Sequence, residues 1–249
     1  MAVSLPSAVL PYADDVARAP SGSRTWRKFA HNPAALLGVL ILLVVVGAAL
    51  VSLLVGVLAV VISVLVGVTL GLISGFVGGR ADTVIMTVVD ITWSFPQILL
   101  ALAFVAALGP SLMTVILVLG FTGWERYARV VRAEVLALRE KDFIEAARAM
   151  GIGSARILLR HVLPNTFSSI VVLSTLQVAQ AILQEAALSF LGVGSGRTYP
   201  TWGQMIALGR DFVSVAWWLP TFPGLAILAT VLAINLVGDR LRDALDPRV

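Results

Sequence analysis

The sequence predicts an all-α, polytopic membrane protein, and three observations support this fold class. Of its 249 residues, 59% are hydrophobic and only 13% are charged. The mean hydropathy is +0.96, and the apolar share is well above that of an ordinary soluble domain. The apolar residues are also gathered in runs long enough to cross a bilayer as helices.

Six transmembrane helices are predicted, between a polar N-terminal segment at 1–33 and a tail at 240–249. The apolar runs lie at about 34–50, 52–78, 83–108, 111–135, 166–191 and 219–238. Basic residues indicate the orientation, because cytoplasmic segments carry most of the Lys and Arg of a membrane protein. Every basic residue except Arg197 and Arg210 falls in a segment that this topology places inside. Both termini are therefore expected in the cytoplasm, and the basic charge is expected to meet anionic lipid and no nucleic acid.

The first two predicted helices have no turn sequence between them. The stretch from Ala34 to Gly79 contains neither a charge nor a proline. A single helix of that length would extend about 69 Å, twice the thickness of a bilayer core. The orientation of the later segments requires two antiparallel helices here. We therefore expect the chain to reverse between Ala48 and Leu53, through residues missing from this sequence or, alternatively, through a tight turn.

The third and fourth predicted helices carry charges and a proline. Pro96 removes a backbone hydrogen bond, so it is expected to bend helix 83–108. Asp90 is predicted either to face a transport path or to bond a neighbouring helix or the amides that the proline frees. Residues 124–140 are expected to continue the fourth helix beyond the membrane, where Glu125 and Arg126 would reach the lipid headgroups.

Small residues recur on the second helix, where Gly67, Gly71, Gly75 and Gly79 are spaced four apart. Glycines at this spacing let two helices approach closely, because no side chain separates them. They predict a packing seam, either within this chain or between two membrane chains.

Polar residues on the fifth helix lie within one broad face at helical spacing. They are Ser174, Gln177, Gln180, Gln184 and Glu185. They could supply hydrogen bonds between helices, or they could line a water-filled path, since amides both donate to and accept from a peptide backbone. We treat the last four, together with Asp90, as a candidate substrate path. Glu185 could instead be structural, near the outer mouth of that path.

Residues 140–165 form a charged island between two apolar runs, which places them outside the lipid. Their first part predicts a short helix that carries Glu145, Ala146, Ala147 and Arg148. Gly151 is expected to end this helix, Ser154 to cap a second turn, and Pro164 to break the chain before the next apolar run. Two short helices at the membrane surface would form a rigid projection that a soluble partner could grip.

Three ordered motifs connect this island with the rest of the chain. Its residues at the spacing of a known motif are Glu145, Ala146, Ala147, Gly151, Leu163 and Pro164. EAALSFLGVG follows at 185–194 and NLVGDRLRDALDPR at 235–248. The island resembles the EAA loop of ATP-binding-cassette importer permeases. With the two later motifs, the chain from about Val51 resembles the second permease subunit of the dipeptide, oligopeptide and nickel importer family.

The resemblance implies a type I importer permease fold and half of a translocation path for dipeptides or oligopeptides, with nickel as the alternative cargo. It also implies a bacterial cytoplasmic membrane and several partners. These are a homologous permease, two cytoplasmic ATPase subunits that bind ATP and Mg²⁺, and an external substrate-binding protein. The ATPase-coupling residues would be Glu145, Ala146, Ala147, Arg148, Gly151, Leu163 and Pro164. A sizeable extracytoplasmic segment joins the first two helices in this family, which favours missing residues between Ala48 and Leu53.

The external segment 192–218 is rich in aromatic residues, namely Tyr199, Trp202, Trp217 and Trp218. Aromatic side chains of this kind are typical of a belt at the membrane interface. Docking of the substrate-binding protein is the alternative interpretation.

Several classes of function are disfavoured by what the sequence contains. It has no GxxxxGK[ST] motif, so this chain is not expected to hydrolyse ATP or to bind a cofactor itself. His31 and His161 are its only histidines, and no cluster has metal-ligand spacing. No nucleophile and base are paired, so the chain is not expected to be an enzyme. A secondary transporter or channel would need discontinuous helices and carboxylates near the midplane, and only Asp90 hints at one.

Overall fold

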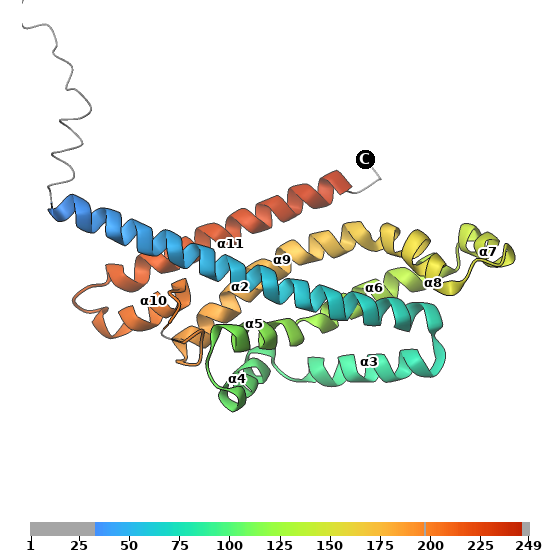
Figure 1. Cartoon of the computed structure of the whole chain (residues 1–249), viewed down its shortest axis with the longest axis horizontal. Coiled ribbons are helices and arrows are strands. Elements are labelled where there is room, and N and C mark those ends of the chain that lie inside the picture. Colours follow the sequence, from blue (N-terminus) through green and yellow to red (C-terminus); the bar gives the residue numbers. More distant parts are fainter. Residues whose placement is uncertain (1–32, 197, 246–249) are drawn as a thin grey trace, which may run out of the picture. The chain divides into compact units, whose positions relative to one another are not determined.

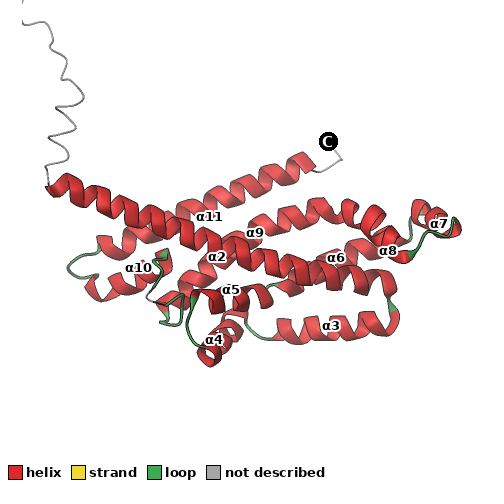
Figure 2. Cartoon of the chain, in the orientation of Figure 1, coloured by secondary structure: helices red, strands yellow, loops and turns green. Residues whose placement is uncertain are grey.

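A computed structural model describes residues 33–196 and 198–245, and these ranges consist of helices joined by short turns (Figure 2). They contain no strand, which confirms the predicted all-α class. Of the predicted N-terminal segment 1–33, only Pro33 is among the described residues. Residues 246–249 of the predicted tail also lie outside them. In chain order the elements are α2 (Pro33–Val77), α3 (Gly79–Ser94), α4 (Gln97–Leu108), α5 (Leu112–Phe121), α6 (Trp124–Arg139), α7 (Asp142–Ala149), α8 (Ser154–Ile157), the π-helical turn η1 (Leu158–Val162), α9 (Leu163–Phe190), α10 (Trp202–Gly209), the 3₁₀ turn η2 (Arg210–Phe212) and α11 (Trp218–Leu245).

Residues 45–249 form one unit, and the packing described below is that of this unit alone. Helices α2, α6 and α9 run along it, with α7 at one end and α10 at the other (Figure 1). Helix α9 packs against both α10 and α11, while α6 packs against α3 and α9. The ends of the unit are thus built from segments that lie far apart in the sequence.

Helix α2 contradicts the predicted reversal between Ala48 and Leu53. These residues lie inside the helix, which runs from Pro33 to Val77 without a gap or a turn. The cause is the absence of turn chemistry that the sequence already showed. No proline or capping residue stops the i→i−4 hydrogen bonds, so each further residue simply extends the helix. Ser52, the polar residue in this stretch, accepts a hydrogen bond of 3.2 Å from the backbone N–H of Trp202.

Three helices in the described ranges are long and apolar enough to cross a membrane: Val46–Val77, Ser154–Phe190 and Trp218–Leu245. Helices α3 and α4 would make a fourth crossing if the two are counted as one bent span. The described residues thus contain several helices that could span a membrane, as expected. The predicted count of six remains a prediction.

Two of the predicted helices are interrupted near their middles. Pro96 separates α3 from α4, whose axes differ by 89°, so the bend predicted there is confirmed. The helix predicted at 111–135 is divided as well, because α5 ends at Phe121 and α6 begins at Trp124. Gly123 is the residue that precedes α6, and glycine is a poor helix former.

The glycines of α2 pack this helix directly against α6. A Cβ atom at Gly71 would lie 2.7 Å from the carbonyl oxygen of Ala128, and Gly67 and Gly75 face α6 just as closely. The seam that these three glycines form therefore lies within the chain. Gly79 is different: it begins α3 with φ of 55°, and a Cβ atom there would meet nothing within 4 Å. It serves the turn between α2 and α3.

Close contacts also join the last helices. Gly203 of α10 lies against Ala186 of α9, and Gly238 of α11 lies against Thr175 of α9. Trp202 is 4% exposed and packs in the same core, so it does not belong to an exposed aromatic belt. The other aromatic residues predicted for that belt are exposed, namely Tyr199, Trp217 and Trp218.

Candidate functional site

Helix α7 is fixed to the helical unit through its apolar side. Ile144 and Ala147 are buried, with exposed fractions of 0% and 2%. They pack in one cluster with Tyr127 and Val131 of α6 and with Ile157 of α8. Of the residues predicted to couple the chain to an ATPase, Ala147 therefore faces inward and anchors the helix.

The opposite side of α7 is open to solvent or to a partner. Glu145 and Ala146 are exposed there, and Arg148 is exposed at the edge of the buried side. Phe143 and Met150 are exposed too, by 45% and 73%, although both are large and apolar. Exposed apolar side chains beside small and charged ones are typical of a protein interface. Sequence reasoning selected the motif residues and missed these two.

The turn after α7 has the geometry that the sequence predicted at Gly151. This residue has φ of 77°, which favours glycine. Its N–H donates to the carbonyl of Arg148 over 2.9 Å, and the N–H of Ile152 donates to the carbonyl of Ala147 over 3.1 Å. The prediction for Ser154 is wrong, since α8 already includes this residue. Gly153 is the N-cap, and no side chain caps the helix.

Pro164 does not break the chain, contrary to the prediction. It lies in the first turn of α9, directly after the π-helical turn Leu158–Val162, and the whole segment Ser154–Phe190 is helical. Proline has no N–H to donate and fits the first turn of a helix. The wider π-helical turn before it also accommodates a residue that has no N–H to donate. Leu163 is half-buried, whereas Pro164 is exposed.

Residues 140–165 are called the coupling segment from here on. Side chains from the end of α6 and from α7 tie this segment to the end of α2. The Arg148 guanidinium lies 5.3 Å from the centre of the Phe76 ring. Arg139 donates from Nη1 to the Gly75 carbonyl over 3.1 Å. A push on α7 would therefore reach α2 directly. The Arg139 contact was not predicted from the sequence.

Two of the predicted path residues converge on a polar layer between α4, α6 and α9. Gln177 accepts a hydrogen bond of 3.0 Å from Arg126 and is buried. Gln184 donates over 2.7 Å to Oε1 of Gln97, whose Nε2 donates over 2.7 Å to the Thr122 carbonyl. Gln97 is a central member of this layer that sequence reasoning missed.

The other predicted path residues lie elsewhere. Asp90 is exposed on α3 and forms an ion pair of 2.8 Å with Arg129 of α6. Its contact is thus with a neighbouring helix, one of the alternatives considered for it. Gln180 is exposed. Glu185 is 0% exposed, and its Oε1 accepts hydrogen bonds from Ser189 and Thr201 over 2.7 and 2.8 Å.

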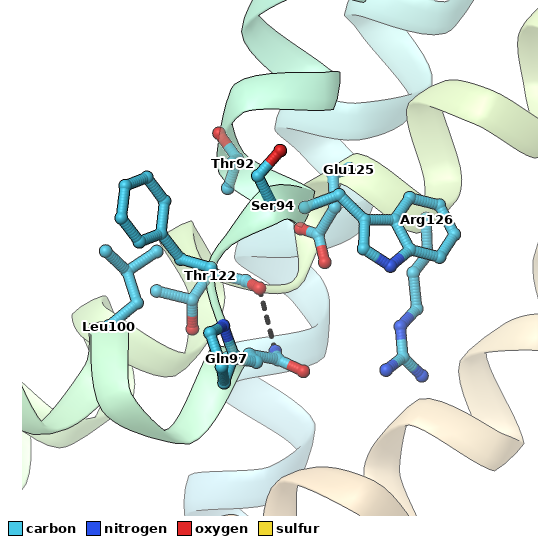
Figure 3. A pocket seen from close by; sticks show the side chains of 10 residues that line it. Thr92, Ser94, Gln97, Leu100, Thr122, Glu125 and Arg126 are labelled. Carbon is cyan, nitrogen blue, oxygen red and sulfur yellow. Dashed lines mark hydrogen bonds between the residues drawn. The ribbon is translucent and has the colours of Figure 1, made fainter.

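Glu125 and Arg126 do not reach the ends of the helical unit, where lipid headgroups were expected to meet them. Helix α6 begins at Trp124, beside the middle of α2, since Ser63 of α2 donates to the Gly120 carbonyl over 2.8 Å. Glu125 is 5% exposed. Both residues line a cavity of about 300 Å³ at the bend between α3 and α4. Figure 3 shows their side chains leaving α6 in different directions, with Gln97 nearby.

Comparison with known proteins agrees with the resemblance in the sequence. A Brucella suis protein named as a peptide transport system permease is 50% identical over 170 residues, which cover 68% of this chain and 57% of that protein. The dipeptide transport system permease of Alkalihalophilus pseudofirmus is 45% identical over 168 residues, covering 68% and 55%. The glutathione transport system permease of Shigella flexneri is 46% identical over 168 residues, with the same coverage. The chain spans little more than half the length of these relatives.

Solved structures share the fold, and the predicted type I importer permease fold is confirmed. The MetNI methionine ABC transporter in an inward-facing conformation superposes with a TM-score of 0.69 at 19% identity, covering 83% of this chain and 98% of that one. An amino acid ABC transporter crystallised with histidines gives 0.61 at 18% identity, covering 86% and 98%. Residues 67–249 match the model of one family along their whole length. The chain therefore belongs to the family of binding-protein-dependent transport system inner membrane components.

Proposed function

We propose that this chain is the transmembrane permease subunit of an ATP-driven importer and forms half of the translocation path for peptides. The observation that carries the proposal is the arrangement of α7. Its buried side fixes it to α6 and α8 through Ile144 and Ala147, while Glu145 and Ala146 face outward. A helix that is rigidly attached and exposed on one side is suited to transmit force from a soluble partner.

The mechanism follows from these attachments. The soluble partners are two cytoplasmic ATPase subunits, which bind the ATP and Mg²⁺ and perform the hydrolysis. When ATP closes the ATPase dimer, the motion enters the chain at α7. It passes to α2 through the contact between Arg148 and Phe76 and to α9 through the continuous helix Ser154–Phe190. Rigid helices then rock between outward-facing and inward-facing states, because nucleotide interacts differently with the two.

The cargo is a peptide in this proposal, and nickel is the less favoured alternative. The similar proteins carry names for peptide, dipeptide and glutathione transport. Amide side chains at Gln97, Gln177 and Gln184 suit a peptide backbone, since they donate and accept without demanding one side-chain type. A homologous permease would complete the path, and an external substrate-binding protein would deliver the peptide.

The proposed location is a bacterial cytoplasmic membrane, with α7 and the C-terminal ends of α2 and α11 on the cytoplasmic side. The prediction of a cytoplasmic N-terminus required the reversal between Ala48 and Leu53, and the unbroken helix α2 does not support it. The basic residues support this orientation, because Arg139 directly precedes the coupling segment and Lys141, Arg148, Arg156 and Arg160 lie within it. Lipid would cover the exposed apolar side chains of the long helices, such as Leu65 on α2 and Leu228 on α11.

Purification from native membrane tests the proposal. We expect P-loop ATPase subunits and a second permease to accompany the chain in stoichiometric amounts. In proteoliposomes with the binding protein, this complex should take up a labelled dipeptide only when ATP is present. Uptake by the isolated chain without ATP would contradict the proposal and indicate a secondary transporter or channel.

A further inference from the structure

The cavity at the bend between α3 and α4 has the size of a ligand site. Its volume of about 300 Å³ lies at the lower end of the range for small-molecule pockets, about 300 to 1,000 Å³. The wall comes from the bend itself, at Phe95 and Pro96, and from the beginning of α6 (Figure 3). A ligand here would be no larger than a short peptide.

The cavity lies beside the interior of the span Val46–Val77, away from both of its ends, since Trp124 at the start of α6 lies against Gly67. Ser63, which bonds the Gly120 carbonyl over 2.8 Å, is close to the midpoint of the span Val46–Val77. Glu125 and Arg126 follow Gly120 by little more than one helical turn. Ionisable residues at the middle of a membrane usually face a cavity and mark a pathway. In secondary transporters, binding sites near the middle of the membrane are built from interrupted helices, and α3 and α4 give this chain a comparable interruption.

Glu125 and Arg126 supply opposite charges to the cavity. Only 5% of Glu125 is exposed, and its Oε2 has no hydrogen-bond partner among the described residues. Within the described part of the chain, neither residue forms a salt bridge. A buried carboxylate without an ion-pair partner is costly. A ligand with a positive group would remove that cost.

The two helix ends at the bend add partial charges of both signs. Helix α3 ends at Ser94, so its last carbonyl groups have no partner within the helix. Helix α4 begins at Gln97, and its first N–H groups give that end a partial positive charge. Because only Phe95 and Pro96 separate the two helices, both ends lie at the cavity wall. A ligand with a positive and a negative end would fit this arrangement.

We propose that this cavity binds the two free termini of a short peptide, a step that rests on the proposed function. Glu125 and the α3 carbonyls accept hydrogen bonds from the α-ammonium group. Arg126 and the first α4 amides hold the carboxylate. Gln177 positions Arg126 through its hydrogen bond of 3.0 Å, and Gln184 positions Gln97 at the cavity wall over 2.7 Å.

The chemistry argues against a divalent cation as the ligand. The cavity offers one carboxylate and places a guanidinium beside it, and a cation would be repelled by Arg126. No group of three or more His, Cys, Asp or Glu residues that could hold a metal occurs in the described residues. A zwitterion satisfies both charges at once.

Equilibrium binding to the assembled importer tests the proposal without the binding protein. The importer, purified with its partners and placed in nanodiscs, is titrated with labelled dialanine, N-acetyl-dialanine and dialanine amide. Glu125→Gln should weaken dialanine binding at least tenfold and leave N-acetyl-dialanine unchanged. Arg126→Gln should weaken dialanine equally and leave the amide unchanged. Glu134→Gln on α6 and Arg80→Gln on α3, both outside the cavity, should bind dialanine as the unmodified importer does.

A second measurement avoids changing the charged residues. Ser94→Cys introduces a thiol at the cavity wall of a chain that has no other cysteine. Saturating dialanine should slow its reaction with a maleimide at least fivefold, and the two blocked peptides should protect less. Equal affinity for all three peptides, or no protection, would overturn the proposal. If the unmodified importer still transports dialanine with ATP, the proposed function survives that result, whereas an importer that neither binds nor transports peptides would overturn both.

Discussion

Arg132 of α6 holds Asp82 of α3 through two parallel hydrogen bonds, Nε to Oδ1 at 2.5 Å and Nη2 to Oδ2 at 2.7 Å. The hydroxyl of Ser74 on α2 donates to the same carboxylate. Three helices thus meet at one carboxylate, close to the coupling segment. Such paired bonds between a guanidinium and a carboxylate are strong and directional. The contact fixes the turn between α2 and α3 onto α6.

Asp82→Asn should lower the free energy of unfolding of the complex by about 2 kcal/mol, because it removes a charge-assisted pair. The thermal midpoint in detergent should fall accordingly, and ATP hydrolysis should respond less to the binding protein. Asp211→Asn is the matched control. That residue also pairs with an arginine, but its side chain is 76% exposed, so little change is expected. Equal midpoints for both variants would contradict the assigned role of Asp82.

Gly71→Ala should destabilise the packing of α2 against α6. The added methyl group would lie 2.7 Å from the Ala128 carbonyl and 3.0 Å from Val131 Cβ, so the helices must separate. Overpacking of this kind costs about 1 to 3 kcal/mol. Gly224→Ala is the control, since a Cβ atom there meets nothing within 4 Å. The amount of assembled permease after detergent extraction would report the difference, and equal yields would argue against the seam.

Ala146→Arg and Ala147→Arg should fail in different ways. Ala146 is exposed on α7, so its variant should fold but lose the stimulation of ATP hydrolysis and most peptide uptake. Ala147 is 2% exposed in the core, so an arginine there should prevent the permease from accumulating in the membrane. Membrane abundance by immunoblot separates the two outcomes from transport activity. An Ala146→Arg variant with normal uptake would contradict the docking role of this face.

The helices and the coupling segment could largely be predicted from the sequence, because local signals specify them. Apolar runs indicate spanning helices, Pro96 indicates a bend, and Gly151 indicates a helix end. The continuity of α2 through Ala48–Leu53 was not predicted. The distribution of basic residues favoured two antiparallel helices there, although the stretch contains no turn residues. The burial of Glu125 was missed because the break before α6 carries only a weak local signal at Gly123.

Pairings between distant segments could not be predicted, since no local pattern encodes them. Asp82 and Arg132 are one example, and Gln97 with Gln184 is another. For the glutamines of α9, helical spacing indicates a shared face but not which neighbouring helix covers each turn. As a result, Gln177 and Gln184 share a polar layer in the structure, whereas Glu185, which was grouped with them, bonds Thr201 beside α10.

Glu185→Gln should be nearly neutral, and Glu185→Leu should be strongly destabilising. Both hydroxyl groups that bond this residue donate to Oε1, and the carbonyl oxygen of a glutamine can accept them in the same place. The other oxygen has no partner among the described residues, so an amide nitrogen there loses nothing. Leucine would leave the hydroxyl protons of Ser189 and Thr201 without their acceptor, at a cost of about 1 to 3 kcal/mol for each.

Thr201→Val provides the test of that assignment, because Thr201 both caps α10 and bonds Glu185. If the bond holds the start of α10 against α9, the thermal destabilisation by Thr201→Val and Glu185→Leu together should be smaller than the sum of the single effects. Thr221→Val in α11 is the control, since its hydroxyl bonds the carbonyl of Trp217, directly before the same helix, and no other helix. The destabilisation by Thr221→Val should add fully to that by Glu185→Leu. Full additivity of Thr201→Val as well would show that Glu185 stabilises the chain through some other contact.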